Sequence, residues 1–405
     1  MLPVTESRTL RRRVYALAIA GVAIPLNGGL VAVLPLAYAA LRDRLAWART
    51  PVDFPLAAFM LWFILAAAIS EARQAALISV TSAVFGVYCA FQLPHRWMRS
   101  RSDLMGVLYR WACVSLPVAA ALGLYSYLFI PNVHLESFRR FTLGGELPGL
   151  YAFGLEVALL LALGAPLRRR WLVLSVAAGT FALIETFSRW ALLGFGTGML
   201  VWSILMLRRS PRAVAVALAT VALALAITIS LPMTRAILVQ YLRGPGGGTR
   251  WVQALVTGFT PRTGFPERLF IWRSTLGVIR DHAWVGVGRS GFYEAYHKHL
   301  DPGARTVMVL ETPVVLGGVY HAHNDILTVA ADSGIPAAVA YVALVLVALI
   351  RIFSRLDPRA APAAAAFVAI LVHGLFDAIP TSFAGPSIVF WLVLAAALQT
   401  GEAGC

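Results

Sequence analysis

The sequence has few charged residues for its length. Only 13% of its 405 residues are Asp, Glu, Lys or Arg, whereas a soluble protein of this size has about 25%. Long apolar runs separate these charges, and hydrophobic residues make up 59% of the chain. Because a lipid bilayer offers no water to backbone polar groups, such runs are typical of membrane-spanning helices. The composition predicts an all-α polytopic membrane protein and excludes an ordinary soluble enzyme.

Negative charge is the scarcer sign. The chain has 19 acidic residues against 34 basic ones, a net charge of +15. In a soluble protein this excess would indicate nucleic-acid binding. Here the arginines form clusters between apolar runs, as the positive-inside rule expects of cytoplasmic loops. We therefore predict no nucleic-acid partner. The clusters lie at Arg11–Arg13, Arg42–Arg49, Arg96–Arg101, Arg168–Arg170, Arg208–Arg212 and Arg351–Arg359.

Several common catalytic and metal-binding patterns are also missing. The sequence has three cysteines and no CxxC pair, so it indicates neither a disulfide framework nor a cysteine-rich zinc site. It has no GxSxG, HExxH or Walker motif. The acidic residues of the outward loops are dispersed and suggest no acid/base pair. Most familiar soluble-enzyme chemistries are thereby set aside.

Twelve apolar runs are candidate membrane spans. Pro25, Gly28 and Gly29 divide the first two, since proline and glycine interrupt helices. With this division all the arginine clusters fall on one side of the membrane, which predicts about twelve transmembrane helices and cytoplasmic termini. The runs lie near residues 14–26, 28–41, 52–70, 75–93, 104–130, 147–165, 171–187, 190–207, 213–231, 335–350, 361–376 and 387–399. The chain then divides into residues 1–231 with helices 1–9, a large outward loop at 232–334 with short helices, and residues 335–405 with helices 10–12.

Within the large loop, one segment has the periodicity of an amphipathic helix. Leu269, Trp272, Leu276 and Ile279 recur at helical spacing, and Asp281–Gly288 ends the pattern.

Arginines on the outward side stand out because the positive-inside rule makes them unexpected. Arg189 lies in a tight link between two spans, and Arg268 belongs to the large loop; Arg139 and Arg140 precede the segment FTLGG. The planar guanidinium suits phosphate, since it donates paired hydrogen bonds. The alternatives are structural: Glu185 precedes Arg189 at ion-pair spacing, and outer arginines also extend to lipid headgroups.

The segment HAHNDILTVAADSGIP places polar residues at the edge of an apolar run. Asn324 or Asp325 is a favourable N-cap, so we expect His323 at the start of a helix. The partial positive charge at a helix start disfavours imidazolium and keeps such a histidine neutral, available as a general base. A capping or packing histidine is the alternative.

Metal binding is a competing hypothesis for the same histidines. Two segments, HKHLD from His297 and HAHND from His321, share a His-x-His-x-Asp pattern whose ligand types suit zinc or manganese. The pattern requires an extended backbone, whereas a helix is expected to begin at the second segment. We therefore predict no metal.

Three further ionisable residues lie within or beside apolar runs. They are Glu156, His373 and Asp377. Such residues act as proton relays or contact substrates.

Three segments resemble the O-antigen ligase family, part of the ligase/polymerase superfamily of bacterial surface polysaccharides. They are the outward link SRWALLG, the loop segment ERLFIWRSTLGVIRDHAWVGVGRSGF and the element HAHNDILTVAADSGIPAA. The second is similar to the family's Arg-x-x-x-Trp helix, and the third to its His-Asn-x-x-Leu element. The order and spacing of these segments extend over nearly the whole chain. One departure is ELPGLYAFG at 146–154, where many relatives carry a His/Asn-Pro-Asn element.

The resemblance implies a fold related to the GT-C membrane glycosyltransferases and an inverting, metal-independent transfer without a cofactor. The implied donor is undecaprenyl-diphosphate-linked O-antigen, and the acceptor is lipid A–core oligosaccharide at the periplasmic face of the bacterial inner membrane. Carried over by position, Arg189 and Arg268 hold the donor diphosphate, and His323 activates the acceptor hydroxyl. Further candidate substrate contacts are Arg139, Arg140, His321 and Asn324.

Two alternative functions remain open. An O-antigen polymerase shares the donor but uses a second lipid-linked repeat unit as acceptor. A non-catalytic exporter of a lipid-linked glycan would bind the same diphosphate without forming a covalent product. A transporter usually has several ionisable groups deep in its spans and an internal repeat, and this sequence shows few such groups and no repeat.

Overall fold

The computed structural model describes most of the chain. It covers residues 4–26, 29–43, 47–69, 73–130, 141–142, 148–232, 234–235, 264–288, 291–300, 306–309, 312–315, 319–355 and 357–399. Statements below about the whole structure refer to these residues.

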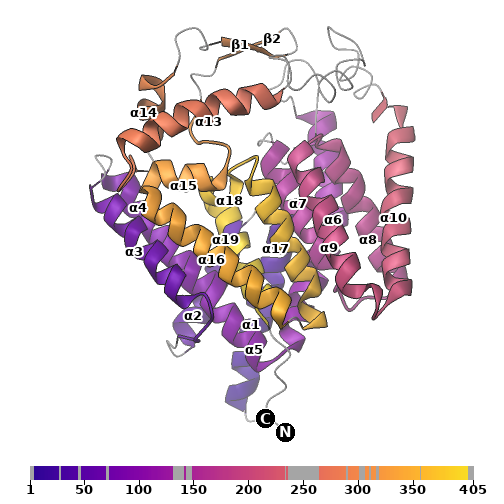
Figure 1. The fold of residues 1–405 in the computed structure, drawn as a ribbon. Helices are drawn as coiled ribbons and strands as arrows, with labels where there is room; N and C mark the ends of the chain where they lie inside the picture. Colours follow the sequence, from indigo (N-terminus) through magenta and orange to yellow (C-terminus); the bar gives the residue numbers. More distant parts are fainter. Residues whose placement is uncertain are drawn as a thin grey trace.

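A helical bundle makes up most of the described chain (Figure 1). Its first half comprises α1 (Val4–Ala23), the 3-10 turn η1 (Ile24–Leu26), α2 (Gly29–Arg42), α3 (Asp53–Ile69), α4 (Arg73–Gly86), the π-helical turn η2 (Val87–Gln92), α5 (Leu93–Ser100), α6 (Asp103–Phe129), α7 (Pro148–Ala162), α8 (Arg169–Glu185), α9 (Arg189–Leu207) and α10 (Pro211–Ser230). The remainder comprises α13 (Gly264–Asp281), α14 (Phe292–Lys298), α15 (Asp325–Ser333), α16 (Ile335–Ser354), η5 (Pro358–Ala360), α17 (Ala361–Gly374), α18 (Ile379–Ser382) and α19 (Ala384–Ala397).

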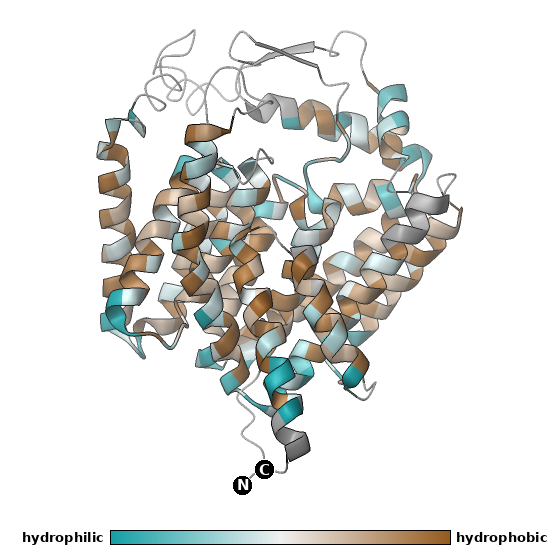
Figure 2. Cartoon of the chain, turned by 180° about the vertical axis from the view of Figure 1, so that it is seen from behind, coloured by the Kyte–Doolittle hydropathy of each residue, from teal (hydrophilic) through white to brown (hydrophobic). Residues whose placement is uncertain are grey.

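Each of the twelve predicted apolar runs lies on a helix of this bundle. The break between the first two runs is confirmed, because α1 ends at Ala23 and α2 begins at Gly29. Four described helices, α6, α9, α10 and α16, are long and apolar enough to cross a membrane. Hydrophobic residues dominate the middle of the bundle, and hydrophilic residues gather towards its two ends (Figure 2). This distribution is that of a helical membrane protein; a total of twelve spans stays a prediction.

The large loop, for which the sequence predicts short helices, also contains one pair of strands. Strands β1 (Thr306–Val309) and β2 (Thr312–Val315) form an antiparallel pair in which Thr306 faces Val315. Both segments are rich in Val and Thr, the β-branched types that favour strands.

Helices α7 and α17 form the centre of the bundle. Every residue from Leu150 to Ala162 is buried, and α17 is lined with buried alanines. Glycines of α9 let it approach α17 closely: a Cβ on Gly194 would lie 2.9 Å from the Ala369 carbonyl oxygen, and one on Gly198 would lie 3.0 Å from that of Ala365. This small-xxx-small contact is a common way for membrane helices to pack. It fixes the start of α9 relative to the end of α17.

Helix α13 lies across one end of the bundle, opposite the end where α1 begins (Figure 1). The predicted helix is confirmed, and it ends at Asp281. The apolar residues at the predicted helical spacing are not all buried: Leu269 and Leu276 are exposed, whereas Ile271 and Val278 are fully buried. Helical periodicity locates an apolar stripe, but α13 has apolar residues on two sides and only packing decides which side is covered.

The turn after α13 is joined to the end of α15 by backbone hydrogen bonds. Ala331 accepts from Val287 N at 2.9 Å, and Ala283 accepts from Ile335 N at 2.7 Å. Gly334 has φ of +86°, and a Cβ there would lie 2.2 Å from the Trp284 carbonyl oxygen. Only glycine permits this contact, which attaches the far end of α13 to the helix pair α15–α16.

Candidate active site

A polar cavity of about 250 Å³ lies beneath α13. Side chains from separate parts of the sequence meet in it, including five candidate residues from the sequence: two arginines, two histidines and Asp377. The lining consists of Pro148, Gly149, Leu150, Phe187, Ser188, Arg189, Trp190, Arg268, His321, His323, Asp377, Ile379 and Phe383. The structure thus brings Arg189, Arg268, His321 and His323 together.

His323 forms the central polar contact of the cavity. Its Nδ1 lies 2.8 Å from Oδ1 of Asp377, which follows α17 in the chain. An ionised carboxylate only accepts hydrogen bonds, so Nδ1 carries the proton and donates it to Asp377. The unprotonated lone pair of the neutral ring is then on Nε2. A carboxylate that fixes the tautomer of a histidine is the usual arrangement around a general base.

Asp377 is held in its ionised form. Burial alone would raise its pKa, but the hydrogen bond from His323 and the charges of His323, Arg268 and His321 bring the pKa well below its usual range. The carboxylate is therefore ionised near neutral pH and available to orient His323. The sequence suggested no acid/base pair among the dispersed carboxylates. It did not reveal this contact because Asp377 is 54 residues from His323 in sequence.

The backbone around His323 is unusual. Asn324 is the N-cap of α15, as expected, and its Oδ1 accepts from the Leu327 amide at 3.0 Å. His323 immediately precedes this cap with φ of +50°, and its own amide donates to Nδ1 of His321 at 3.2 Å. Among the described residues, the only other non-glycine residue with positive φ is Phe187, which also lines the cavity. Such strained conformations gather at functional sites.

Arg189 is the first residue of α9 and is exposed to the cavity. Its guanidinium lies 5.7 Å from the ring centre of Trp190, and Trp190 stacks on Phe376 with ring centres 4.3 Å apart. Because Phe376 precedes Asp377, this stack ties the start of α9 to the turn that carries the carboxylate. Glu185 is buried and accepts a hydrogen bond from Thr234 Oγ1. Among the described residues, Glu185 therefore hydrogen-bonds to Thr234 and not to Arg189, the ion-pair partner that the sequence spacing suggested.

Arg268 reaches the cavity from the opposite side, on the second turn of α13. It is partly buried, and its charge is one of those that lower the pKa of Asp377. Two arginines from different elements thus border one cavity beside a histidine–carboxylate pair.

The remaining predicted contacts are placed differently. Asn324 does not line the cavity. Its Nδ2 donates to the Leu375 carbonyl at 2.9 Å and its Oδ1 accepts from the Leu327 amide, so both polar atoms of its side chain bond to backbone groups. Arg139 and Arg140 lie outside the described residues. The segment 146–154, in which the chain departs from the family pattern, contributes Pro148, Gly149 and Leu150 to the lining.

The geometric argument against a metal at the histidines is wrong. The helix begins after His323, so the two imidazoles lie close together, with ring centres 4.2 Å apart. Potential ligand atoms of His321, His323 and Asp377 all lie within 4.8 Å of one another. Asp325, the third residue of the sequence pattern, instead accepts a hydrogen bond from Thr381 at 2.6 Å. The absence of a metal requirement stays a prediction.

The buried carboxyl of Asp325 should make the free energy of unfolding depend on pH. Burial raises its pKa to about 7, against the opposing hydrogen bond from Thr381. An unfolded aspartate has a pKa near 4, so between about pH 4 and 7 the folded state keeps a proton that the unfolded chain has lost. The free energy of unfolding therefore falls as the pH rises through this window, by at most about 4 kcal/mol.

We expect Asp325→Asn, a neutral residue of the same shape, to remove this contribution. Thermal unfolding in detergent from pH 4 to pH 8 measures it. The melting midpoint of the variant should exceed that of the wild type at pH 8, and the difference should vanish towards pH 4. A difference that is the same at every pH would contradict the buried neutral carboxyl.

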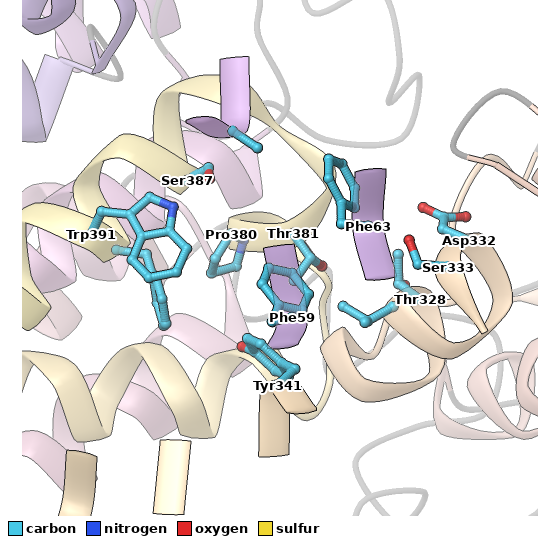
Figure 3. A pocket seen from close by; sticks show the side chains of 13 residues that line it. Phe59, Phe63, Thr328, Asp332, Ser333, Tyr341, Pro380, Thr381, Ser387 and Trp391 are labelled. Atoms are coloured by element: carbon cyan, nitrogen blue, oxygen red, sulfur yellow. The ribbon is translucent and has the colours of Figure 1, made fainter. Parts of the chain in front are cut away.

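A second cavity is lined in part by residues of α15 and α18 (Figure 3). Its lining includes Phe59, Phe63, Tyr341 and Trp391, and it shares no lining residue with the first cavity. No arginine or histidine is among the described residues that line it, so the candidate active site is the polar cavity.

Comparison with known families identifies part of the chain. Residues 173–342 match the family model described as O-antigen ligase. The match includes Arg189, Arg268 and His323, and it confirms the resemblance that the sequence motifs indicate. Asp377 lies beyond it. No curated protein matches the chain.

Proposed function

We propose that the chain is an inverting membrane glycosyltransferase of the O-antigen ligase type. It transfers O-antigen polysaccharide from undecaprenyl diphosphate to lipid A–core oligosaccharide, at the periplasmic face of the bacterial inner membrane. The observation that carries the proposal is one cavity holding two arginines from different elements beside a carboxylate-oriented histidine. The family match over residues 173–342 supports an O-antigen substrate.

The arginines suit the leaving group of this reaction. A glycosyl diphosphate is already activated, and cleavage of its bond to the sugar leaves additional negative charge on a phosphate oxygen. Arg189 and Arg268 stabilise that charge with paired hydrogen bonds. The first turns of α7 and α9 also line the cavity, and the N-terminal ends of helices favour anions.

His323 suits the other half of the reaction. Its Nε2 takes the proton from the acceptor hydroxyl as the hydroxyl oxygen bonds to the anomeric carbon. The bond between that carbon and the diphosphate breaks on the opposite face, so the configuration is inverted. Asp377 keeps Nδ1 protonated throughout and stabilises the imidazolium that forms.

The reaction as proposed needs no divalent cation, because the arginines provide the positive charge. We expect dialysis against EDTA to leave the rate of transfer within about twofold of the untreated enzyme. The control is the same preparation with zinc or manganese restored. Loss of activity that either metal rescues would assign His321, His323 and Asp377 as ligands instead.

The decisive experiment supplies purified lipid-linked O-antigen with each acceptor in turn. Ligase activity gives glycan attached to lipid A–core. A product formed only with a second lipid-linked repeat unit would identify a polymerase, and donor binding without a covalent product would identify a transporter. In the host, deletion should remove capped lipopolysaccharide and leave lipid-linked polymer to accumulate.

A further inference from the structure

A buried carboxylate–imidazole pair lies within the bundle, outside the cavity. Glu156 of α7 and His373 of α17 have fully buried side chains, and His373 Nδ1 lies 2.9 Å from Glu156 Oε1. Neither residue lines the cavity. The second oxygen of Glu156 and Nε2 of His373 have no hydrogen-bond partner among the described residues. Ionisable groups in such surroundings are costly, so their presence in the bundle points to a function.

The pair lies where three site-forming helices meet. The first turn of α7 lines the cavity, α9 begins with Arg189, and α17 leads into the turn that carries Asp377. A Cβ on Gly194 of α9 would lie 3.0 Å from Glu156 Oε2, so α9 packs directly against the carboxylate. The contact between Glu156 and His373 therefore sets how α7 and α17 are rotated against each other at the point where α9 crosses them.

A short series of hydrogen bonds leads from this pair to the proposed base. The carbonyl oxygen of His373 accepts from the amides of Phe376 at 3.0 Å and of Asp377 at 2.9 Å. Asp377 then accepts from His323 Nδ1 at 2.8 Å. Helix α17 ends at Gly374, one residue after His373. His373 is thus the last residue of α17 that a polar side-chain contact fixes to a neighbouring helix before the turn.

We propose that Glu156 and His373 are positioning residues for the Asp377–His323 pair. Their contact fixes the rotation of α17, and the hydrogen bonds to the His373 carbonyl transmit that rotation to the Asp377 carboxylate. The inference rests on the proposed function, since it takes Asp377 and His323 as the residues that manage the acceptor proton. It adds two residues, 217 positions apart in sequence, that touch neither substrate.

The pair can be removed without emptying the core. Replacing a buried ion pair by apolar side chains of similar volume is often neutral or stabilising. The test variant is therefore Glu156→Met combined with His373→Leu, measured for thermal stability, donor binding, kcat and KM. We expect a melting midpoint at or above that of the wild type, unchanged donor binding, and kcat lower by about 10- to 100-fold, since misplacement by about 1 Å can cost 10²-fold.

Two controls separate positioning from packing. Glu156→Gln keeps the shape and still accepts from His373 Nδ1, so kcat should stay within about threefold of the wild type. His95→Leu removes another buried histidine, on α5, which contacts Ala395 of α19 and Gln399 just beyond that helix rather than the site. Its kcat and KM should be unchanged, whatever its effect on the melting midpoint.

The proposal is overturned if the double variant transfers glycan at the normal kcat. It is likewise overturned if the loss of kcat/KM comes from a rise in KM for the donor. It is also overturned if neither the double variant nor Glu156→Gln folds, because the pair is then structural. If the wild type transfers glycan to neither acceptor, the proposed function fails on its own. The structure of the double variant then decides: positioning requires the contact between His323 Nδ1 and Asp377 Oδ1 to be lost, and its survival refutes the role.

Discussion

Replacing His323 by alanine should reduce glycan transfer by about 10²- to 10⁴-fold, the usual contribution of a general base. The variant should fold, because the Asn324 cap and the body of α15 do not depend on the imidazole. Binding of the donor should survive, since the proposed diphosphate contacts are made by arginines. Transfer and donor binding are measured side by side on the same detergent-solubilised preparation.

His321→Ala is the matched control, two residues away and in the same cavity. Its Nδ1 accepts the amide of His323, so its loss should loosen the turn and lower the rate by about tenfold or less, as expected for a lost neutral hydrogen bond. If the His321 variant is the inactive one, the base is misassigned. If the His323 variant no longer binds donor, that residue holds the diphosphate and another group removes the proton.

Arg189→Ala and Arg268→Ala should each weaken donor binding and lower kcat/KM by about 10²- to 10³-fold, the scale seen when one preorganised donor is removed from a developing anion. Lysine should restore little at either position, because an ammonium group cannot make the paired hydrogen bonds of guanidinium. Titration with lipid-linked donor and steady-state kinetics with each variant measure the two effects.

Arg280→Ala provides the matched control for the arginines. Arg280 lies on the same helix as Arg268, but it is exposed and pairs with Asp281 at 3.2 Å. Its loss should leave donor binding unchanged. An Arg189 or Arg268 variant that behaves like the Arg280 variant would show that the residue only contacts lipid headgroups or other protein groups.

The sequence predicted the parts of this structure that depend on local patterns. Apolar runs located the bundle helices, and the cap at Asn324 located the start of α15, because both signals lie within a few neighbouring residues. The outward arginines were found because a simple rule makes them unexpected. Motif resemblance singled out Arg189, Arg268 and His323, which the fold places around one cavity.

The partners of these residues could not be predicted in the same way. Asp377 was noted as an ionisable group at a membrane edge, but nothing in a single sequence pairs it with His323. The contact depends on where the turn after α17 lies against α15, which is set by packing of glycines and alanines along α9 and α17. The metal argument failed for a related reason: His321 and His323 both precede the helix, and the positive φ of His323 brings their rings together, which no sequence pattern predicts.

The attachment of the turn after α13 to α15 has a geometric consequence for the arginines of the site. The backbone bonds to Ala331 and from Ile335 hold the turn that follows Asp281, whereas Arg268 is 13 residues away, about 20 Å along the axis at 1.5 Å per residue. A tilt of roughly 10° about that attachment moves Arg268 by about 3.5 Å, more than the length of a hydrogen bond. The tilt of α13 therefore sets the spacing between Arg268 and Arg189, the two proposed contacts of the diphosphate.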